Sequence, residues 1–270
     1  MVQASILFLG DHDRKNEHGF QLLTNSPQIT EEVEILSMKN WTSVASVVSS
    51  MQAQGLVGRD LAVALHDFVR DIPFGFTRQF DLATADYTLQ RQRGHCTPKS
   101  ELFVSLLRRA GFADATVVTV SIPGDVLHYL GSGESSPFPS TLQHCFTQVT
   151  VEKGGKLCRL DSYVIDPPLF QAARERLKVT GRHAGYGIHK EATNEWDGSQ
   201  DAFCQYVPST QTSHLEFCMN STNEVVSRPN YLHSGFTRLL RIPIIGWPAG
   251  AWLETQSKVF DRLRNRISIE

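Results

Sequence analysis

One segment of this sequence constrains the fold more than any other, because it predicts a sharply bounded helix directly after a cysteine. Thr97 is a favourable N-cap, Pro98 suits the first helical position, and Gly111 is a favourable C-terminal stop. The apolar residues between these ends form a broad stripe, which comprises Leu102, Phe103, Leu106, Leu107 and Ala110. We therefore expect a helix that buries one face and has Cys96 at its N-terminal end.

The sequence after this helix predicts an antiparallel sheet. Residues 115–121 are rich in β-branched side chains, and two further strands are expected at His144–Val151 and Leu157–Ile165. Gly154-Gly155, between the last two strands, is a strong hairpin signal. The order of helix, strand and hairpin predicts an α+β fold.

Further helices are expected on both sides of this region. A helix opens at Gly58, where apolar residues recur at helical spacing from Leu61. Shorter helices are expected over residues 42–52, 81–89 and 169–177, and a loop rich in Gly, Ser and Pro over residues 131–140.

The C-terminal part combines an apolar stretch with several arginines. Ile242–Leu253 is shorter than the ~20 residues that a membrane-spanning helix needs, and it contains Pro and Gly. We expect it to be buried structure without a membrane contact. Acidic residues interleave with the arginines, Arg264 among them, so we expect these to form a solvated helical face.

Composition limits the class of protein. A chain of 270 residues with 41% hydrophobic residues suits one large domain, and we treat residues 1–270 as a single domain. The net charge of −2 excludes a dedicated nucleic-acid binder, which needs a basic surface to neutralise phosphates. The sequence has no internal repeat, so a repeat architecture is not expected. It leaves the oligomeric state open.

The cysteines indicate a reducing compartment. Their number is odd and no Cys-x-x-Cys pair occurs, which argues against a disulfide framework and a zinc ribbon. The N-terminal apolar run lacks a basic start and is a poor signal peptide. We therefore expect a cytoplasmic protein without a resident metal. The cysteines are Cys96, Cys145, Cys158, Cys204 and Cys218.

Three residues could form a nucleophilic site. The N–H groups and dipole at a helix start favour a thiolate at Cys96. A thiol nucleophile needs a base, and the base needs a third group that fixes its tautomer. His144 on one expected strand and Asp161 on the next could fill these roles. The alternative is that Cys96 is a small buried thiol without a chemical role.

Several sequence blocks resemble the transglutaminase-like superfamily, from about Leu61 to Asp166. The blocks are Phe68–Gly75, Ala85–Leu89, the Gly94–Ser100 turn with the Leu106–Phe112 helix end, His144–Val149, and Leu160-Asp161 after the hairpin. The resemblance implies a papain-like core in which Cys96 is the nucleophile, His144 the base and Asp161 the orienting group. Residues 1–60 and 167–270 would then be extensions of a core over residues 61–166.

The hairpin register bears on the third member of the triad. A strict two-residue turn at Gly154-Gly155 pairs His144 with Ile165 and places Asp161 on the same face but about 13 Å along the strand, at ~3.3 Å per residue. Asp166 would be nearer but on the opposite face. Direct pairing of His144 with Asp161 needs a longer loop or a bulge. The resemblance favours Asp161, and Asp166 is kept as the alternative.

Other candidates concern the oxyanion and the substrate. The backbone N–H of Cys96 is the natural first oxyanion donor, and Gln90, Gln92 or His95 could supply the second. His95 could equally be a turn residue. The resemblance places Phe146 where it shapes the acyl pocket. His183 and His189 match no standard metal-ligand spacing, so we assign them to loops.

These observations predict an enzyme that forms a Cys96 acyl-enzyme on an amide, peptide-like or thioester substrate and resolves it with water or an amine. No cofactor is required, because the protein supplies nucleophile, base and oxyanion donors itself. The expected partner is a small-molecule or peptide-like substrate. The alternative is a catalytically silent member of the same fold that acts as a binding or interaction protein.

Overall fold

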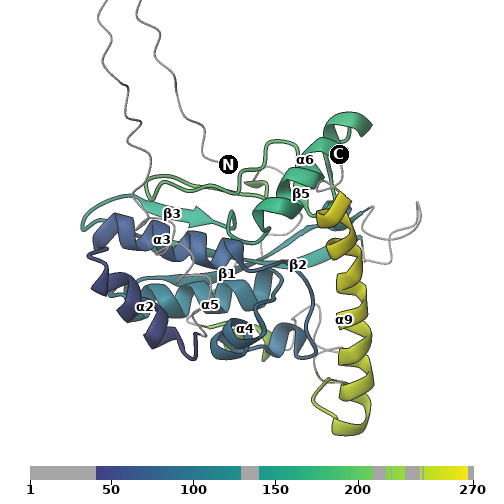
Figure 1. Ribbon diagram of the computed structural model, residues 1–270, viewed down its shortest axis with the longest axis horizontal. Coiled ribbons are helices and arrows are strands. Elements are labelled where there is room, and N and C mark those ends of the chain that lie inside the picture. The colour runs from purple at the N-terminus through teal and green to yellow at the C-terminus, as the bar shows by residue number, and fades with distance from the viewer. Residues whose placement is uncertain are drawn as a thin grey trace, which may run out of the picture. The chain divides into compact units, whose positions relative to one another are not determined.

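The central sheet and its covering helices are shown in Figure 1. The computed structural model describes residues 41–128, 140–208, 217–219, 221–228, 238 and 240–266. Residues 1–40 of the expected N-terminal extension and nearly all of the expected loop at 131–140 lie outside this part.

The helices among the described residues are α2 (Val44–Ala53), α3 (Gly58–Asp71), η1 (Phe80–Leu82), α4 (Ala85–Arg91), α5 (Cys96–Arg109), η2 (Gly124–Leu127), α6 (Pro167–Thr180), α7 (Thr222–Val226) and α9 (Pro243–Arg266). The strands are β1 (Thr116–Pro123), β2 (Thr141–Thr150), β3 (Leu157–Leu160), β4 (Ala184–Gly185), β5 (Ile188–His189) and β6 (Phe217–Met219).

Four strands form the main sheet in the order β3-β2-β1-β6, and every neighbouring pair is antiparallel. The longest ladder joins β1 to β2, from Thr116 opposite Gln148 to Pro123 opposite Thr141. The expected α+β class with an antiparallel sheet is confirmed.

The α5 helix lies at the centre of the helical layer. It contacts α2, α3 and α4 as well as strands β1 and β2, and Figure 1 shows these helices grouped around it. Its apolar stripe is completely buried at Leu102, Phe103, Leu106 and Leu107. Because this packing fixes the axis of α5, it also fixes the position of Cys96 relative to the sheet.

The start of α5 differs from the prediction. The helix begins at Cys96, and His95 rather than Thr97 is its N-cap. The Thr97 side chain does not cap the helix, because its hydroxyl donates to Cys145 Sγ at 3.8 Å. The first turn is closed instead by the Lys99 N–H, which donates to the His95 carbonyl at 3.0 Å.

The hairpin also differs from the prediction. β2 pairs with β3 from Thr147 opposite Leu160 to Thr150 opposite Leu157, so the connection is longer than the two-residue turn considered above. The expected strand Leu157–Ile165 is too long, since β3 ends at Leu160 and the chain then turns.

The C-terminal stretch folds as a helix through Pro248 and is not uniformly buried. Leu253 and Phe260 are buried, whereas Trp247 and Trp252 are 67% and 57% exposed. The stretch was expected to be buried throughout, but a helix on the surface turns only one face inward. Arg264 is likewise not solvated as expected, because it pairs with Asp166 at 2.6 Å.

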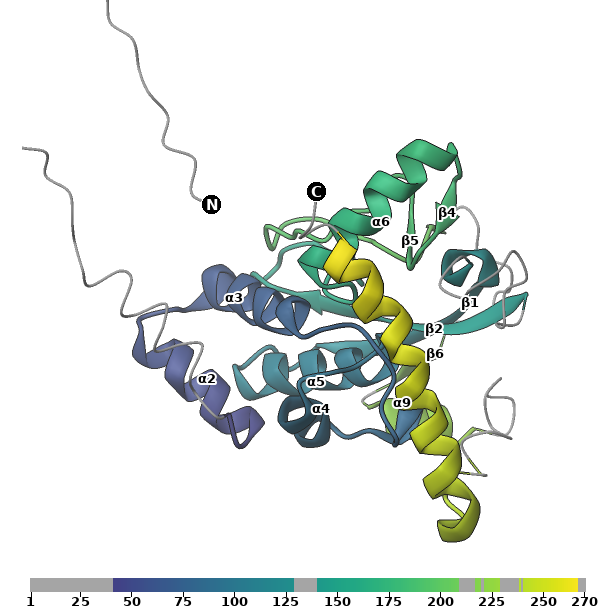
Figure 2. The same ribbon diagram turned by 45° about the vertical axis from the view of Figure 1, so that its right-hand side comes forward.

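Helix α9 packs against α6, as Figure 2 shows. Among the helices of the described residues, none is both long enough and apolar enough to cross a membrane.

Candidate active site

Cys96 is the first residue of α5 and is half-buried. The N–H groups of Cys96 and Thr97 have no carbonyl one turn earlier within the helix, and Pro98 carries no N–H. The partial positive charge of the helix start therefore lies beside the sulfur of Cys96.

His144 and Asp161 form a buried pair. His144 Nε2 lies 2.7 Å from Asp161 Oδ2, and both side chains are almost completely inaccessible. His144 comes from the middle of β2, whereas Asp161 follows the last residue of β3. The observed register keeps Asp161 on the face of His144, and the turn after Leu160 brings the carboxylate to the imidazole.

Asp161 is held by a set of backbone donors. Its carboxylate accepts hydrogen bonds from the N–H groups of Cys204, Gln205 and Tyr206. These bonds fix the position of the carboxylate, and its Oδ2 is directed at His144. Sequence inspection could not find these donors, because they act through the backbone and lie far along the chain from Asp161.

The protonated form of His144 is favoured. Burial lowers the pKa of His144, but hydrogen bonds with Asp161 and Cys96 and the charges of these two groups outweigh burial and raise the pKa to about 9. Since Nε2 is engaged by Asp161, Nδ1 is the ring nitrogen left for Cys96. The structure therefore brings together the three residues Cys96, His144 and Asp161.

The loop that carries Asp161 is anchored at nearly every residue. The Ser162 hydroxyl lies 2.8 Å from His66 Nε2. The Tyr163 hydroxyl lies 2.8 Å from both Ser100 Oγ and Thr147 Oγ1. The position of Asp161 is thus set by α3, α5 and β2 together.

Lys99 contributes a further anchor to this loop. Its buried ammonium donates to the carbonyls of Arg70, Ile72 and Val164, at 3.3, 2.7 and 2.9 Å. Burial lowers the pKa of Lys99 to about 7, although Asp166 acts in the opposite direction. The sequence signal for this anchor is a lysine three residues after Cys96, inside an otherwise apolar helix.

Asp166, the alternative to Asp161, lies at the other end of the loop and has a structural role. It caps α6 and accepts a hydrogen bond from the Phe74 N–H at 2.8 Å. Burial raises the pKa of Asp166, but the contact with Arg264 outweighs burial and lowers it. Asp166 therefore joins α6, α9 and the segment at Phe74, and it does not pair with His144.

The predicted oxyanion and substrate residues lie in different surroundings. His95 is buried, with Nε2 2.8 Å from Asp81 Oδ1. Gln90 is exposed on α4, and Gln92 donates to the Leu89 carbonyl at 2.7 Å. Within the described part of the chain, no hydrogen bond joins either glutamine to Cys96 or His144.

Phe146 is buried on the same side of β2 as His144, since strand residues two apart share a face. Its ring stacks on Tyr206 with centroids 5.0 Å apart, and it meets Phe203 edge-on. This aromatic cluster therefore lies beside the three backbone donors of Asp161.

Cys145 lies on the other face of β2, next to the start of α5. The Thr97 hydroxyl is 3.8 Å from Cys145 Sγ and 3.9 Å from Cys96 Sγ. Burial, together with the nearby Cys96, raises the pKa of Cys145. Cys145 is thus a poor nucleophile beside a more accessible thiol.

His189 lies nearer to this site than the sequence indicated. It belongs to β5, and its N–H donates to the carbonyl of Cys204, whose own N–H binds Asp161. Burial lowers the pKa of His189, while the charge of Asp161 opposes burial. Among the described residues, no group of three or more His, Cys, Asp or Glu is arranged to hold a metal ion.

Comparison with known proteins gives a match to a family. Residues 45–162 match the sequence profile of the transglutaminase-like superfamily. This match includes Cys96, His144 and Asp161, and it starts before residue 61 and ends before Asp166. No curated protein matches the chain, and no solved structure matches it.

Proposed function

Residues 45–162 form a domain of the transglutaminase-like superfamily, and on this premise we propose that the chain catalyses acyl chemistry through Cys96. The substrate carries an amide, peptide-like or thioester carbonyl. The observation that carries the proposal is the buried His144–Asp161 pair, whose imidazole interacts with Cys96 so that the pKa of His144 is raised.

The proposed first step forms a thioester. Cys96 Sγ, as a thiolate, attacks the carbonyl carbon, and the carbonyl electron pair moves to the oxygen. When the tetrahedral intermediate collapses, the bond to the leaving amine or thiol breaks and His144 gives that group its proton. The enzyme is left with an acyl group on Cys96.

The second step regenerates the thiol. Water or an amine attacks the thioester carbonyl, His144 takes the proton of the attacking group, and Cys96 leaves as a thiolate. Asp161 stays ionised throughout and keeps Nε2 of His144 protonated, so Nδ1 alone exchanges protons. The Cys96 N–H at the start of α5 is suited to bind the developing oxyanion.

The experiment uses p-nitrophenyl acetate, because its acyl group is small and its leaving group is coloured. We expect a burst of p-nitrophenolate and an acetyl group on Cys96 by intact and peptide mass spectrometry. Cys96→Ala should abolish both signals. Cys158→Ala, which removes a buried thiol on β3, is the matched control and should retain both.

A catalytically silent binding protein would behave differently. Its Cys96 would react with iodoacetamide at neutral pH no faster than an ordinary cysteine, whereas an activated thiol reacts well below pH ~8. Slow alkylation of the wild-type protein, or full turnover by Cys96→Ala, would contradict the proposed function. Adding methylamine then distinguishes hydrolysis from transfer by the appearance of N-methylacetamide.

A further inference from the structure

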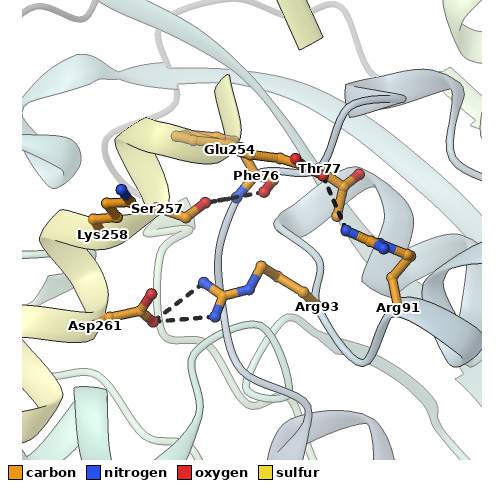
Figure 3. A pocket seen from close by; sticks show the side chains of 8 residues that line it. All are labelled: Phe76, Thr77, Arg91, Arg93, Glu254, Ser257, Lys258 and Asp261. Carbon is orange, nitrogen blue, oxygen red and sulfur yellow. Dashed lines mark hydrogen bonds and ion pairs between the residues drawn. The ribbon is translucent and has the colours of Figure 1, made fainter. Parts of the chain in front are cut away.

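A polar cavity lies between α9 and the chain that leads into α5. Its volume is about 240 Å³, and side chains of both segments face it (Figure 3). The lining residues are Phe76, Thr77, Arg91, Arg93, Glu254, Ser257, Lys258 and Asp261. The acyl chemistry proposed above uses none of these residues.

The walls of this cavity are held in place. Ser257 Oγ accepts a hydrogen bond from the Phe76 N–H at 2.7 Å and donates to the Phe76 carbonyl at 2.9 Å. Arg93 reaches Asp261 with both terminal nitrogens at 3.2 Å. These contacts join α9 to both lining segments of the N-terminal half, so the cavity has a defined shape.

Positive charge exceeds negative charge around the cavity. Each of the two lining carboxylates is shared by two guanidinium groups: Glu254 pairs with Arg78 and Arg91, and Asp261 pairs with Arg93 and Arg264.

Even with Asp166, which also pairs with Arg264, three carboxylates face four arginines and Lys258. Lys258 forms no ion pair with any residue that the structure describes, and its exposed side chain lines the cavity. The cluster therefore has capacity for one more anionic group.

Thr77 points independently to a ligand. Its side chain lines the cavity and is only 2% exposed, yet its hydroxyl has no hydrogen-bond partner among the described residues. A buried polar group without a partner is costly, and most such groups in native proteins bind something. A hydroxyl can donate to an anionic oxygen.

We propose that this cavity is a binding site for a small ligand that carries a carboxylate or phosphate group, held by Arg91, Arg93, Lys258 and the Thr77 hydroxyl. Guanidinium groups, an ammonium and a hydroxyl are donors that suit both anions. The volume suits a small molecule or the charged end of a longer one.

The cavity is joined to the start of α5 by packed residues. The Phe76 ring lies 5.3 Å from the His95 ring, between centroids, and His95 directly precedes Cys96. The site is nevertheless separate from the proposed chemistry, because binding at Arg91 and Lys258 needs no reaction at Cys96.

The test measures direct binding by isothermal titration calorimetry on the full chain, with inorganic phosphate in one series and succinate in another. We expect saturable binding of at least one anion. Lys258→Met and Thr77→Val should each weaken it about fivefold or more, which is the effect of losing one hydrogen bond or ion pair at such a site. Lys156→Met, in the exposed hairpin connection, is the matched control for loss of one positive charge and should bind as the wild type does.

The two anions identify the ligand class, since binding of phosphate alone supports a phosphate-bearing ligand and binding of succinate alone supports a carboxylate-bearing one. Absence of saturable binding for both would overturn the proposal. It would also be overturned if Lys156→Met weakened binding as much as Lys258→Met, because the effect would then be general charge attraction. Cys96→Ala should bind the anion unchanged, so failure of the proposed acyl chemistry would leave this result intact.

Discussion

The structure contains two similar buried His–Asp pairs, His144–Asp161 and His95–Asp81, and only the histidine of the first interacts with the Cys96 thiol. His144 Nε2 is 2.7 Å from Asp161 Oδ2, and His95 Nε2 is 2.8 Å from Asp81 Oδ1. The two pairs have nearly the same geometry and burial. What distinguishes them is the partner of the second ring nitrogen.

The second nitrogen of His144 is left for the Cys96 thiol, and the pKa of His144 is raised to about 9, against burial, by its contacts with Asp161 and Cys96. His95 instead stacks on the Phe80 ring at 4.6 Å, and its Nδ1 is buried without a hydrogen-bond partner among the described residues. A buried His–Asp pair is therefore not by itself a sign of catalysis. The group on the far side of the imidazole decides which chemistry the pair supports.

Matched substitutions of the two histidines give the largest expected contrast. His144→Gln should lower kcat/KM for p-nitrophenyl acetate about 10³-fold, because general acid–base catalysis contributes about 10²–10⁴-fold. His95→Gln should lower it less than about tenfold, since His95 shares no hydrogen bond with the thiol. Circular dichroism of both variants checks that the fold is retained. Equal losses in two folded variants would remove the distinction between the pairs.

Substitutions of the two carboxylates, Asp161 and Asp81, should also differ in their effect on kcat/KM, but by less than the substitutions of the two histidines. Asp161→Asn should lower kcat/KM by about 10²-fold, because the amide no longer holds the His144 tautomer or stabilises its charge. It should also shift the alkaline limb of the pH profile to lower pH, since Asp161 raises the pKa of His144. Asp81→Asn is the matched control and should leave that limb in place. If the alkaline limb of the pH profile shifted only in Asp81→Asn, the assignment of Asp161 as the partner of His144 would be contradicted.

The pH dependence of the wild-type protein tests the protonation state of His144. Because its pKa in the fold is about 9, the imidazolium that protonates the leaving group is lost as the pH rises through that value. For an amide substrate, whose leaving amine needs that proton, activity should then fall about tenfold per pH unit above pH 9. A profile that rises steadily past pH 10 would contradict this protonation state.

The same shift predicts a change in stability. The unfolded chain releases the His144 proton near pH 6.5, the ordinary pKa of histidine, and the folded chain near pH 9. The stabilisation is therefore complete below pH 6.5 and is lost as the pH rises to 9. Urea denaturation across this range should show a smaller loss in His144→Gln than in the wild type.

The sequence predicts the helix and strands that form the site better than it predicts where they begin and end. The stripe of α5 and the parity of the hairpin were sufficient to place Cys96 at a helix start and to put His144 and Asp161 on one face. The turn after Leu160 was not predictable, because it depends on contacts from His66, Lys99 and Ala202, which lie far away in the sequence. Likewise, the observed start of α5 differs from the predicted one. Thr97, the expected N-cap, binds Cys145 on strand β2, which is distant in the sequence.

The extension after residue 166 was the least predictable part. A mixed apolar and basic sequence does not tell which face of a surface helix turns inward. The contact of Arg264 with Asp166, which settles this for α9, joins two positions that no local pattern relates.

Lys99→Met should affect stability more than chemistry. The variant leaves the carbonyls of Arg70, Ile72 and Val164 without this donor, and we expect a loss of about 2 kcal/mol near pH 9. Between the lowered pKa of about 7 and the ordinary lysine pKa of 10.5, the unfolded chain holds the Lys99 proton more tightly, so wild-type stability rises with pH. Lys99→Met should flatten this rise in urea denaturation. An unchanged slope would show that Lys99 does not titrate there.

The smallest effect is expected at Gln90, and it tests whether the oxyanion needs a side-chain donor from α4. Gln90 is exposed, and no hydrogen bond joins it to Cys96 or His144 in the described part of the chain. Gln90→Ala should therefore change kcat less than about twofold, whereas loss of an oxyanion donor costs about 10²–10³-fold. His95→Gln serves as the comparison, because His95 adjoins Cys96 and keeps one buried nitrogen without a partner among the described residues. A loss of about 10² in Gln90→Ala would mean that α4 moves toward the thiol when substrate binds. The difference between the surroundings of the His144–Asp161 and His95–Asp81 pairs would then change on binding.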